Sequence, residues 1–189
     1  MENPENLKFL DLFNNSISNS FYVEEAWRIV ERASVILKDP ESPDKKGGFL
    51  AICDSQTGTL ATMQIGTIGS DEKKRLYMRY ATEKATRLYM NYETFRSFET
   101  KDESKNHFGG GVHIHACNLI VAFSAFKEKV DEAISVAYGS FCSVVNGQEY
   151  TQKDLPYIYA KIYEFITEST RERFKDNMEI YKLAHDLYR

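Results

Sequence analysis

The pattern of apolar and polar positions predicts two β-hairpins in the middle of the chain, at Gly48–Ile65 and Gly111–Ser124. The first strand of one hairpin, Gly48–Asp54, and the last strand of the other, Leu119–Phe123, are apolar on both faces. Such strands are typical of the middle of a sheet that is covered on both sides. Four of their side chains are therefore predicted to be almost fully buried: Leu50, Ile52, Ile120 and Val121.

Helical spacing of apolar residues marks the segments around the hairpins. The helix between the hairpins is predicted to begin after Ser70, because Asp71 and Glu72 suit a first turn. Asparagines and serines at 14–20 predict a break or a cap before the next helix, and Thr151 with Asp154 resembles a capping box. The predicted helices lie at about 3–18, 22–38, 71–92, 130–141, 155–165 and 171–187. Helices on both sides of the hairpins indicate the α/β (α+β) class.

The second hairpin is introduced by a glycine-rich stretch, Gly109–Gly111. The residues that follow alternate in polarity, as in a half-buried strand. This alternation places the side chains of His113 and His115 on the same face of the sheet. Cys117 and Asn118 are predicted to form a two-residue turn before the last strand.

Composition limits the class of protein. The 189 residues suit one domain of residues 1–150 with a helical extension at 151–189 that packs on it. The formal net charge of -4, with both signs interspersed, argues against a nucleic-acid surface. The sequence shows neither a signal peptide nor an apolar run of membrane-spanning length. Three cysteines far apart in the sequence fit reduced thiols in the cytoplasm.

Four stretches, in this order and spacing, carry a resemblance to a known family. They are Phe49–Asp54 followed by Gly58–Leu60, then Ala81–Thr86 with its Ala-x-x-Lys-Ala-Thr pattern, Gly110–Ile114 and Asp131–Ala133. Together they make residues 22–140 similar to the GlcG/HbpS family, which is named for a glycolate-operon protein and a haem-binding sensor protein. The resemblance implies a profilin-like fold, in which an antiparallel sheet has helices on both faces. It also implies binding of a small molecule, with haem as one possible cofactor.

The chain departs from the family pattern at two places. The last strand of the family usually carries glycines where this chain has Val121–Ala125, so Phe123 would shrink a pocket built by close backbone approach. His113 replaces the proline that usually follows the paired glycines. The chain therefore looks like a diverged member.

The candidate ligand pocket lies where the glycine turn is expected to approach the helix that carries Lys84. The glycines could form a nest of backbone N–H groups for an anion, or a turn that permits tight packing. The Lys84 ammonium could meet a carboxylate of the ligand, or it could find an acid of the protein while its stem packs. The candidate ligand-binding residues are Lys84, His107, Gly109, Gly110, Gly111 and His113.

Histidines suggest a second kind of site. His113 and His115 stand at i and i+2 of a strand, so both imidazoles point the same way, as metal ligands often do. The alternative is a polar sheet face that contains two histidines. His107 lies close enough in the sequence to complete a cluster of three histidines.

Three functions remain open. The first is a cytoplasmic, non-enzymatic binding or sensor module for a small molecule, possible ligands being haem or another carboxylate-bearing compound. The second is a metal-dependent enzyme that uses His107, His113 and His115. The third is a structural subunit of an oligomer. Aromatic side chains beyond Tyr150 predict a homodimer or a higher homo-oligomer.

Overall fold

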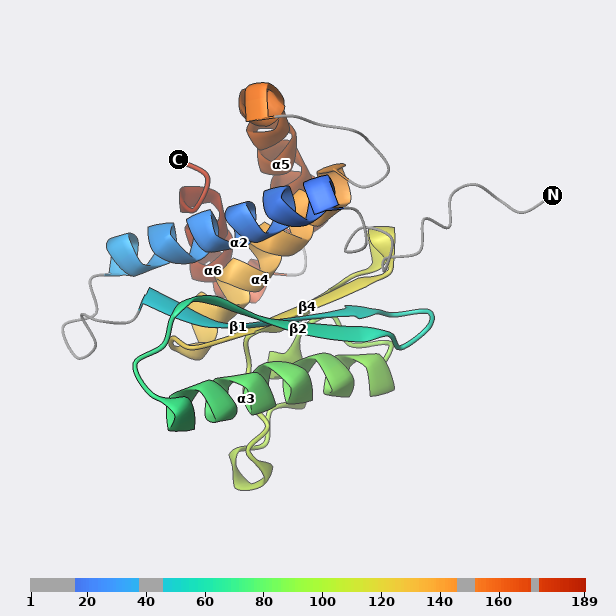
Figure 1. Ribbon diagram of the computed structural model, residues 1–189. Helices are drawn as coiled ribbons and strands as arrows, with labels where there is room; N and C mark the ends of the chain where they lie inside the picture. Colours follow the sequence, from blue (N-terminus) through green and yellow to red (C-terminus); the bar gives the residue numbers. More distant parts are fainter. Residues whose placement is uncertain (1–15, 38–45, 146–151, 171–173) are drawn as a thin grey trace.

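A computed structural model describes residues 16–37, 46–145, 152–170 and 174–189 of the chain. A four-stranded antiparallel sheet has the order β2-β1-β4-β3 (Figure 1). The strands are β1 (Lys46–Asp54), β2 (Leu60–Thr67), β3 (Gly111–Ile114) and β4 (Leu119–Ser124). The antiparallel sheet, with helices on both faces, confirms the predicted fold class and is consistent with the profilin-like arrangement.

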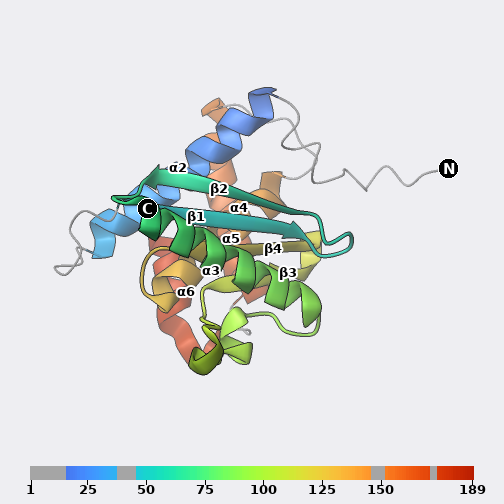
Figure 2. The same ribbon diagram turned by 60° about the horizontal axis from the view of Figure 1, so that its bottom comes forward.

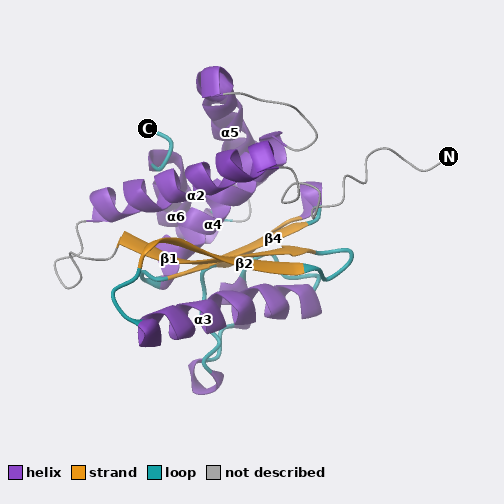
Figure 3. Cartoon of the chain, in the orientation of Figure 1, coloured by secondary structure: helices purple, strands orange, loops and turns teal. Residues whose placement is uncertain are grey.

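The two faces of the sheet are covered unequally (Figure 3). One face carries α3 (Asp71–Met90), which packs on β1 and β4. The other carries α2 (Ser16–Leu37) and α4 (Glu128–Val145), and the C-terminal helices α5 (Leu155–Thr170) and α6 (Met178–Asp186) pack on α4. No helix in the described parts of the chain is long and apolar enough to cross a membrane.

The two central strands form the core, as their sequences predicted. Leu50, Ile52, Ile120 and Val121 are each at most 1% exposed, which confirms the prediction for all four. The layer between α3 and the sheet is built mainly from small side chains, which let the helix lie close to the strands. This layer contains Ala51, Cys53, Ala81, Ala85, Leu88, Ile120 and Ala122.

Several predicted boundaries were wrong. Helix α2 begins at Ser16, so residues 16–20, which were predicted to break or cap a helix, are helical. Strand β3 ends at Ile114, and the connection to β4 is a 3-10 turn, His115–Cys117, followed by Asn118 in the left-handed conformation. The connection thus spans residues 115–118, two more than the predicted two-residue turn, and Asn118 suits its last position because Asn tolerates the left-handed conformation better than most residues. The predicted helix at 3–18 and the cap at Thr151 fall largely or wholly outside the described residues.

Two short 3-10 segments connect α3 to β3, η1 (Ser97–Thr100) and η2 (Glu103–Lys105). Just before them, the Phe95 carbonyl accepts a hydrogen bond from the His113 N–H at 2.8 Å, and Arg96 forms an isolated antiparallel bridge with Val112. The connection therefore closes the β3 edge of the sheet.

The C-terminal helices contact α2, the first described helix of the chain, through Arg28. The Arg28 guanidinium on α2 lies over the rings of both Tyr159 and Tyr188, at 4.6 and 5.0 Å from their centroids. It also donates to the Leu187 carbonyl oxygen at 3.2 Å and pairs with Glu25. Most of the aromatic side chains beyond Tyr150 are buried in the core or pack against it. Of the seven aromatic residues expected at a subunit contact, only Tyr157 and Tyr163 are classed as exposed.

The buried strand β4 provides a test of the core. Replacing Ile120 with Ala should cost about 2–5 kcal/mol of unfolding free energy, because the side chain is fully buried and the cavity cannot collapse between a helix and a sheet. Urea unfolding measures the change. Val35→Ala, at an exposed position of α2, is the control and should change stability by less than about 1 kcal/mol. A loss below about 0.5 kcal/mol for Ile120→Ala would show that β4 is not central.

Docking of α6 should depend on pH. The His185 ring is 5% exposed and packs on Tyr163 and Tyr181, and burial lowers its pKa. Arg189 lowers it further, while Asp186 raises it. The native state then takes up a proton less readily than the unfolded state, so stability should be lost as the pH falls below about 6.5. Unfolding of the wild type and of His185→Phe at pH 7 and 5 should show a larger loss for the wild type. Equal losses would contradict this.

Candidate functional site

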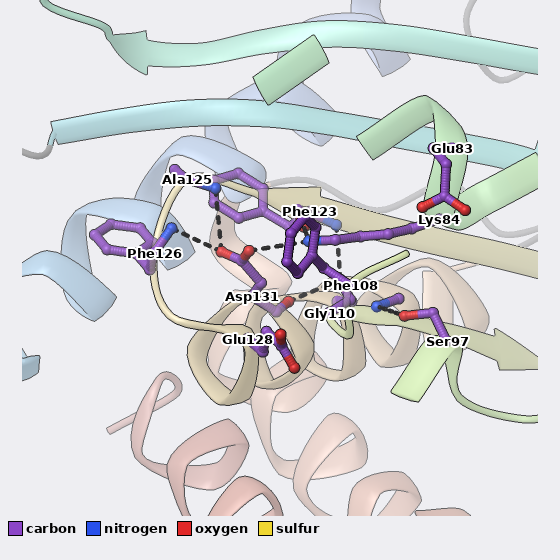
Figure 4. A network of polar contacts seen from close by, with 12 residues as sticks. Glu83, Lys84, Ser97, Phe108, Gly110, Phe123, Ala125, Phe126, Glu128 and Asp131 are labelled. Atoms are coloured by element: carbon purple, nitrogen blue, oxygen red, sulfur yellow. Dashed lines mark hydrogen bonds and ion pairs between the residues drawn. The ribbon is translucent and has the colours of Figure 1, made fainter. Parts of the chain in front are cut away.

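Lys84 lies at the centre of the region expected to bind a ligand, but its ammonium is inside the protein. The residue is 2% exposed in the middle of α3. Its Nζ lies 3.0 Å from Oδ2 of Asp131 on α4 and donates to the Phe123 carbonyl oxygen of β4 at 2.8 Å (Figure 4). Of the two interpretations offered by the sequence, the geometry supports the lysine whose amine meets an acid of the protein.

Asp131 joins the two layers of the fold at this point. Its Oδ1 accepts hydrogen bonds from the N–H groups of Ala125 and Phe126, at 3.2 and 2.8 Å, so it also holds the turn between β4 and α4 (Figure 4). Burial raises the pKa of Asp131 to about 6, although Lys84 and the two N–H groups act in the opposite direction. The carboxylate is a structural acid with its acceptor positions in use.

The glycine turn packs directly against this ion pair. Gly110 has φ of +114°, and a Cβ at this position would lie 2.6 Å from Cβ of Asp131 and 2.7 Å from Nζ of Lys84. The Gly110 carbonyl accepts from the Ser135 hydroxyl at 2.8 Å. The close approach expected between the turn and α3 is therefore present, but it is filled by protein atoms. Glycine is needed here because any side chain would push the ion pair apart.

The other glycines are also enclosed. Gly109 is buried, and a Cβ there would approach Phe98 and Glu128. The Gly111 N–H donates to the Ser97 hydroxyl at 2.8 Å, so this donor is used by the protein itself. The geometry favours the packing interpretation of the glycine turn over the anion nest.

A second buried ion pair lies beside the first. Glu132, which follows Asp131 on α4, is 1% exposed and pairs with Arg96. Burial raises the pKa of Glu132, while Arg96 lowers it. Because neighbouring residues on a helix point in different directions, the two acids reach different partners. One acid fastens α3, and the other fastens the segment that closes the β3 edge.

Arg87 holds the connection between α3 and β3 in place. Its guanidinium donates to the carbonyls of Ser97 and Phe108 at 2.5 and 2.6 Å, and its Nε donates to Glu83 at 2.6 Å. Because arginine presents several donors in a rigid fork, one side chain can fix two points of a loop. The segment from η1 to the glycine turn is thereby fastened to α3.

An open depression of about 770 Å³ spreads over the outer side of α3. It reaches from β2 to the segment held by Arg87, and His107 is the only one of the predicted ligand residues among its lining residues. Its lining combines methionine side chains with hydroxyl, amide and charged groups. These residues are Thr62, Met78, Arg79, Thr82, Glu83, Thr86, Arg87, Met90, Asn91, Thr100 and His107.

His107 lies at the η2 side of this depression. Its side chain is 32% exposed, and Nε2 lies 3.7 Å from Oε1 of Glu83. The imidazole is thus accessible from solvent beside a carboxylate that is itself committed to Arg87. Of the residues proposed from the sequence, His107 is the one placed to meet a molecule from outside.

The predicted half-buried strand that carries both His113 and His115 is wrong, because β3 ends at Ile114 and is buried on both faces, and His115 lies in the 3-10 turn that follows. The two imidazole rings nevertheless lie side by side. They stack, with centroids 3.7 Å apart and an interplanar angle of 29°. Tyr92 packs edge-on against both rings, and Phe95 packs on His115. His113 is 1% exposed, so the pair belongs to an aromatic cluster at the β3 edge.

The three-histidine metal centre is not formed. Within the described residues, no group of three or more histidine, cysteine, aspartate or glutamate side chains is arranged to hold a metal ion. His107 lies by Glu83 on α3, whereas His113 and His115 pack among aromatic rings. Proximity in the sequence was misleading because the glycine turn lies between His107 and β3.

The sequence interpretation missed Arg87, Arg96 and the role of the two acids. Glu83 and Arg87 stand four residues apart on a helix, a spacing that commonly forms an ion pair, so this pair was within reach. The carbonyl partners of Arg87 are loop atoms, and their positions follow from tertiary structure alone. Asp131 and Glu132 belong to one of the four family-like stretches, but nothing in their spacing identified a cation for each.

Comparisons of this chain with protein-family models, with curated proteins and with solved structures find no match. The resemblance to the GlcG/HbpS family thus rests on the four short stretches alone.

The Lys84–Asp131 pair can be tested by a double-mutant cycle. Asp131→Asn keeps an acceptor for the Ala125 and Phe126 N–H groups but leaves a buried ammonium without its counter-charge, so it should cost about 3–5 kcal/mol. Lys84→Met together with Asp131→Asn should cost less than the sum of the two single changes. Chemical denaturation measures all four proteins. Additive costs would show that the pair is not coupled.

The Lys84→Met variant should also depend on pH. In the wild type, burial raises the pKa of Asp131 to about 6, so the stability that comes from the bound proton is present at low pH and is lost as the pH rises through about 6. Lys84 lowers this pKa, so its removal should raise the pKa of Asp131 further, and the variant should go on losing stability at pH values where the wild type has levelled off. The deficit relative to wild type should therefore grow from pH 5 to pH 8. Lys74→Met is the matched control, since its ion pair with Asp71 has the same 3.0 Å distance but lies at the surface. It should cost less than about 1 kcal/mol at either pH.

Proposed function

We propose that this chain is a non-catalytic, small-molecule-binding module of the GlcG/HbpS type, whose ligand occupies the depression beside His107. The observation that carries the proposal is the depression itself. Its volume of about 770 Å³ lies in the range of small-molecule sites, and it combines an apolar lining with a few polar groups. The position at Lys84, expected from the sequence, is filled by the buried ion pair and is not part of the proposal.

The chemistry of the lining favours an amphipathic anion. Met78 and Met90 are 42% and 74% exposed, and flexible thioethers suit an apolar ligand body of irregular shape. Arg79 and His107 supply cationic or hydrogen-bonding groups for a carboxylate. Glu83 pairs with Arg87 and also lies 3.7 Å from His107, so the charge offered to an anion comes from Arg79, and His107 offers a hydrogen-bonding group.

Haem is one ligand that meets this description, and the family resemblance is the reason to include it. Haem carries carboxylates, and its iron takes histidine or methionine as axial ligands. The side chains that fit this requirement here are His107, Met78 and Met90, all of which line the depression. Haem would supply an iron centre at this position, while Arg79 would meet a carboxylate. The three free cysteines also fit the proposed cytoplasmic location.

The proposal is tested with two probes, haemin and 8-anilinonaphthalene-1-sulfonate. Binding of haemin is followed by visible absorbance and binding of the sulfonate by fluorescence. Arg79→Ala combined with His107→Ala should weaken binding at least tenfold, or about 1.4 kcal/mol, because it removes both groups that can meet the anion. Arg75→Ala, which removes an exposed cation of α3 just outside the depression, should leave the affinity unchanged.

Two outcomes would contradict the proposal. Equal affinity of all three proteins would place the binding site elsewhere. Failure of both probes to bind, together with no co-purified small molecule in native mass spectrometry, would favour the structural-subunit interpretation. Binding of the sulfonate without haemin would keep the site and reject haem as its ligand.

A further inference from the structure

The two edges of the sheet are treated differently by the fold. The β3 edge is closed by Phe95 and Arg96 and is held there by the Arg96–Glu132 ion pair. The β2 edge pairs with no other strand in the described residues, since β2 is the first strand in the order β2-β1-β4-β3. An unpaired edge presents a row of free backbone donors and acceptors to any other strand that reaches it.

The hydrogen bonding of the hairpin shows which backbone groups point outward. The Asp54 N–H donates to the Thr59 carbonyl at 2.9 Å, so residues 54 and 59 form a hydrogen-bonded pair. In an antiparallel ladder such pairs alternate with pairs that are not hydrogen-bonded. In the register that pairs Cys53 with Leu60, the N–H and C=O groups of every second residue of β2 therefore point away from β1. These residues are Leu60, Thr62, Gln64 and Gly66.

One end of this edge is already capped. The Gln64 side-chain amide donates to the Gly66 carbonyl at 2.9 Å, and Gly66 has φ of +70°, which bends the strand. The available edge is therefore Leu60–Gln64. This stretch contains neither a charged residue nor a proline, the devices that usually protect an edge from pairing.

Exposed apolar side chains lie on both sides of this edge. On the α3 side, Leu60 is 37% and Met78 is 42% exposed, and Met78 lines the same depression as Thr62. On the other side, Val23 and Trp27 of α2 are 42% and 47% exposed.

Trp27 and Val23 lie on the flank of α2 that faces away from the C-terminal helices. Glu25 and Arg28 occupy the opposite flank, where both contact Tyr159. Figure 2 shows α2 on the β2 side of the sheet, with α6 on the far side. The edge strand thus has α3 on one face and α2 on the other, and both helices carry exposed apolar side chains.

We propose that this surface binds a second copy of the chain, with the two β2 strands pairing antiparallel about a two-fold axis at Thr62. Thr62 then faces Thr62 of the partner, and Leu60 faces Gln64, so all outward backbone groups of the stretch are paired. A two-fold axis brings the same short stretch of both copies together, so any charge on it would face a like charge of the partner. Because the stretch is uncharged, the two copies can pair without electrostatic repulsion. This self-complementarity favours a second copy over a different protein as the occupant.

The experiment measures the mass of the full-length chain in solution by light scattering and sedimentation at micromolar concentration. The wild type should have twice the mass of the chain. Thr62→Lys should convert it to a monomer, because two ammonium groups would face each other at the axis. Thr62→Val, which keeps a β-branched and uncharged side chain, should remain a dimer. Gln56→Lys adds the same charge at an exposed turn outside the paired stretch and should also remain a dimer.

A wild type that sediments as a monomer overturns the proposal, and so does an oligomer whose mass is the same in Thr62→Lys. Circular dichroism checks that Thr62→Lys is folded. If it is not, Trp27→Glu takes its place, because this side chain lies on an exposed border outside the strand and should weaken the dimer at least tenfold. A Trp27→Glu protein that dimerises as well as the wild type contradicts the interface. Thr62 also lines the depression, so the masses are measured without haemin or the sulfonate. Trp27 does not line it, so Trp27→Glu should weaken the dimer without changing the affinity for either probe.

Discussion

Two adjacent buried acids at the start of α4 hold the layers of this fold together. Asp131 pairs with Lys84 from the opposite side of the sheet, and Glu132 pairs with Arg96 from the connection that closes the β3 edge. Each acid pays a desolvation cost that only a well-placed cation offsets, so neither layer can shift without leaving a charge unpaired. Gly110 fits the same constraint, because a Cβ at this position would lie 2.6 Å from Cβ of Asp131 and 2.7 Å from Nζ of Lys84.

The sequence was a good guide where one physical property decided the outcome. Doubly apolar strands had to be central, and Leu50 and Ile120 are buried accordingly. Boundaries were less predictable where local preference and tertiary packing compete. Ser16 and Asn19 suit a cap or a turn, but the structure continues α2 through them. Asn118 indicated a turn, and a turn is present. The 3-10 segment His115–Cys117 that comes before Asn118 was not part of the predicted two-residue turn.

The candidate site was harder to predict because the same residue types can either bind a ligand or hold two parts of the protein together. Lys84, Gly110 and Gly111 have the composition of an anion site, and their proximity in space was expected correctly. Whether such a cluster binds a ligand or another part of the protein depends on which acid reaches the lysine, and Asp131 is 47 residues away. The depression over α3 was not foreseen because it is made by the side of the helix that the apolar pattern leaves unassigned. His107 is the only predicted ligand residue that lines it.

The long-range contact between α2 and the C-terminal residues has a consequence for synthesis of the chain. Arg28 and the Leu187 carbonyl are 159 residues apart, and at usual elongation rates roughly 8–30 s separate their translation. Throughout this interval the guanidinium lacks its final partners. Glu25, three residues earlier on the same helix, is synthesised before it and can pair with it at once. Arg28 can thus have a counter-charge as soon as α2 forms and keeps it in the finished fold, where Tyr159 and Tyr188 pack against the same guanidinium.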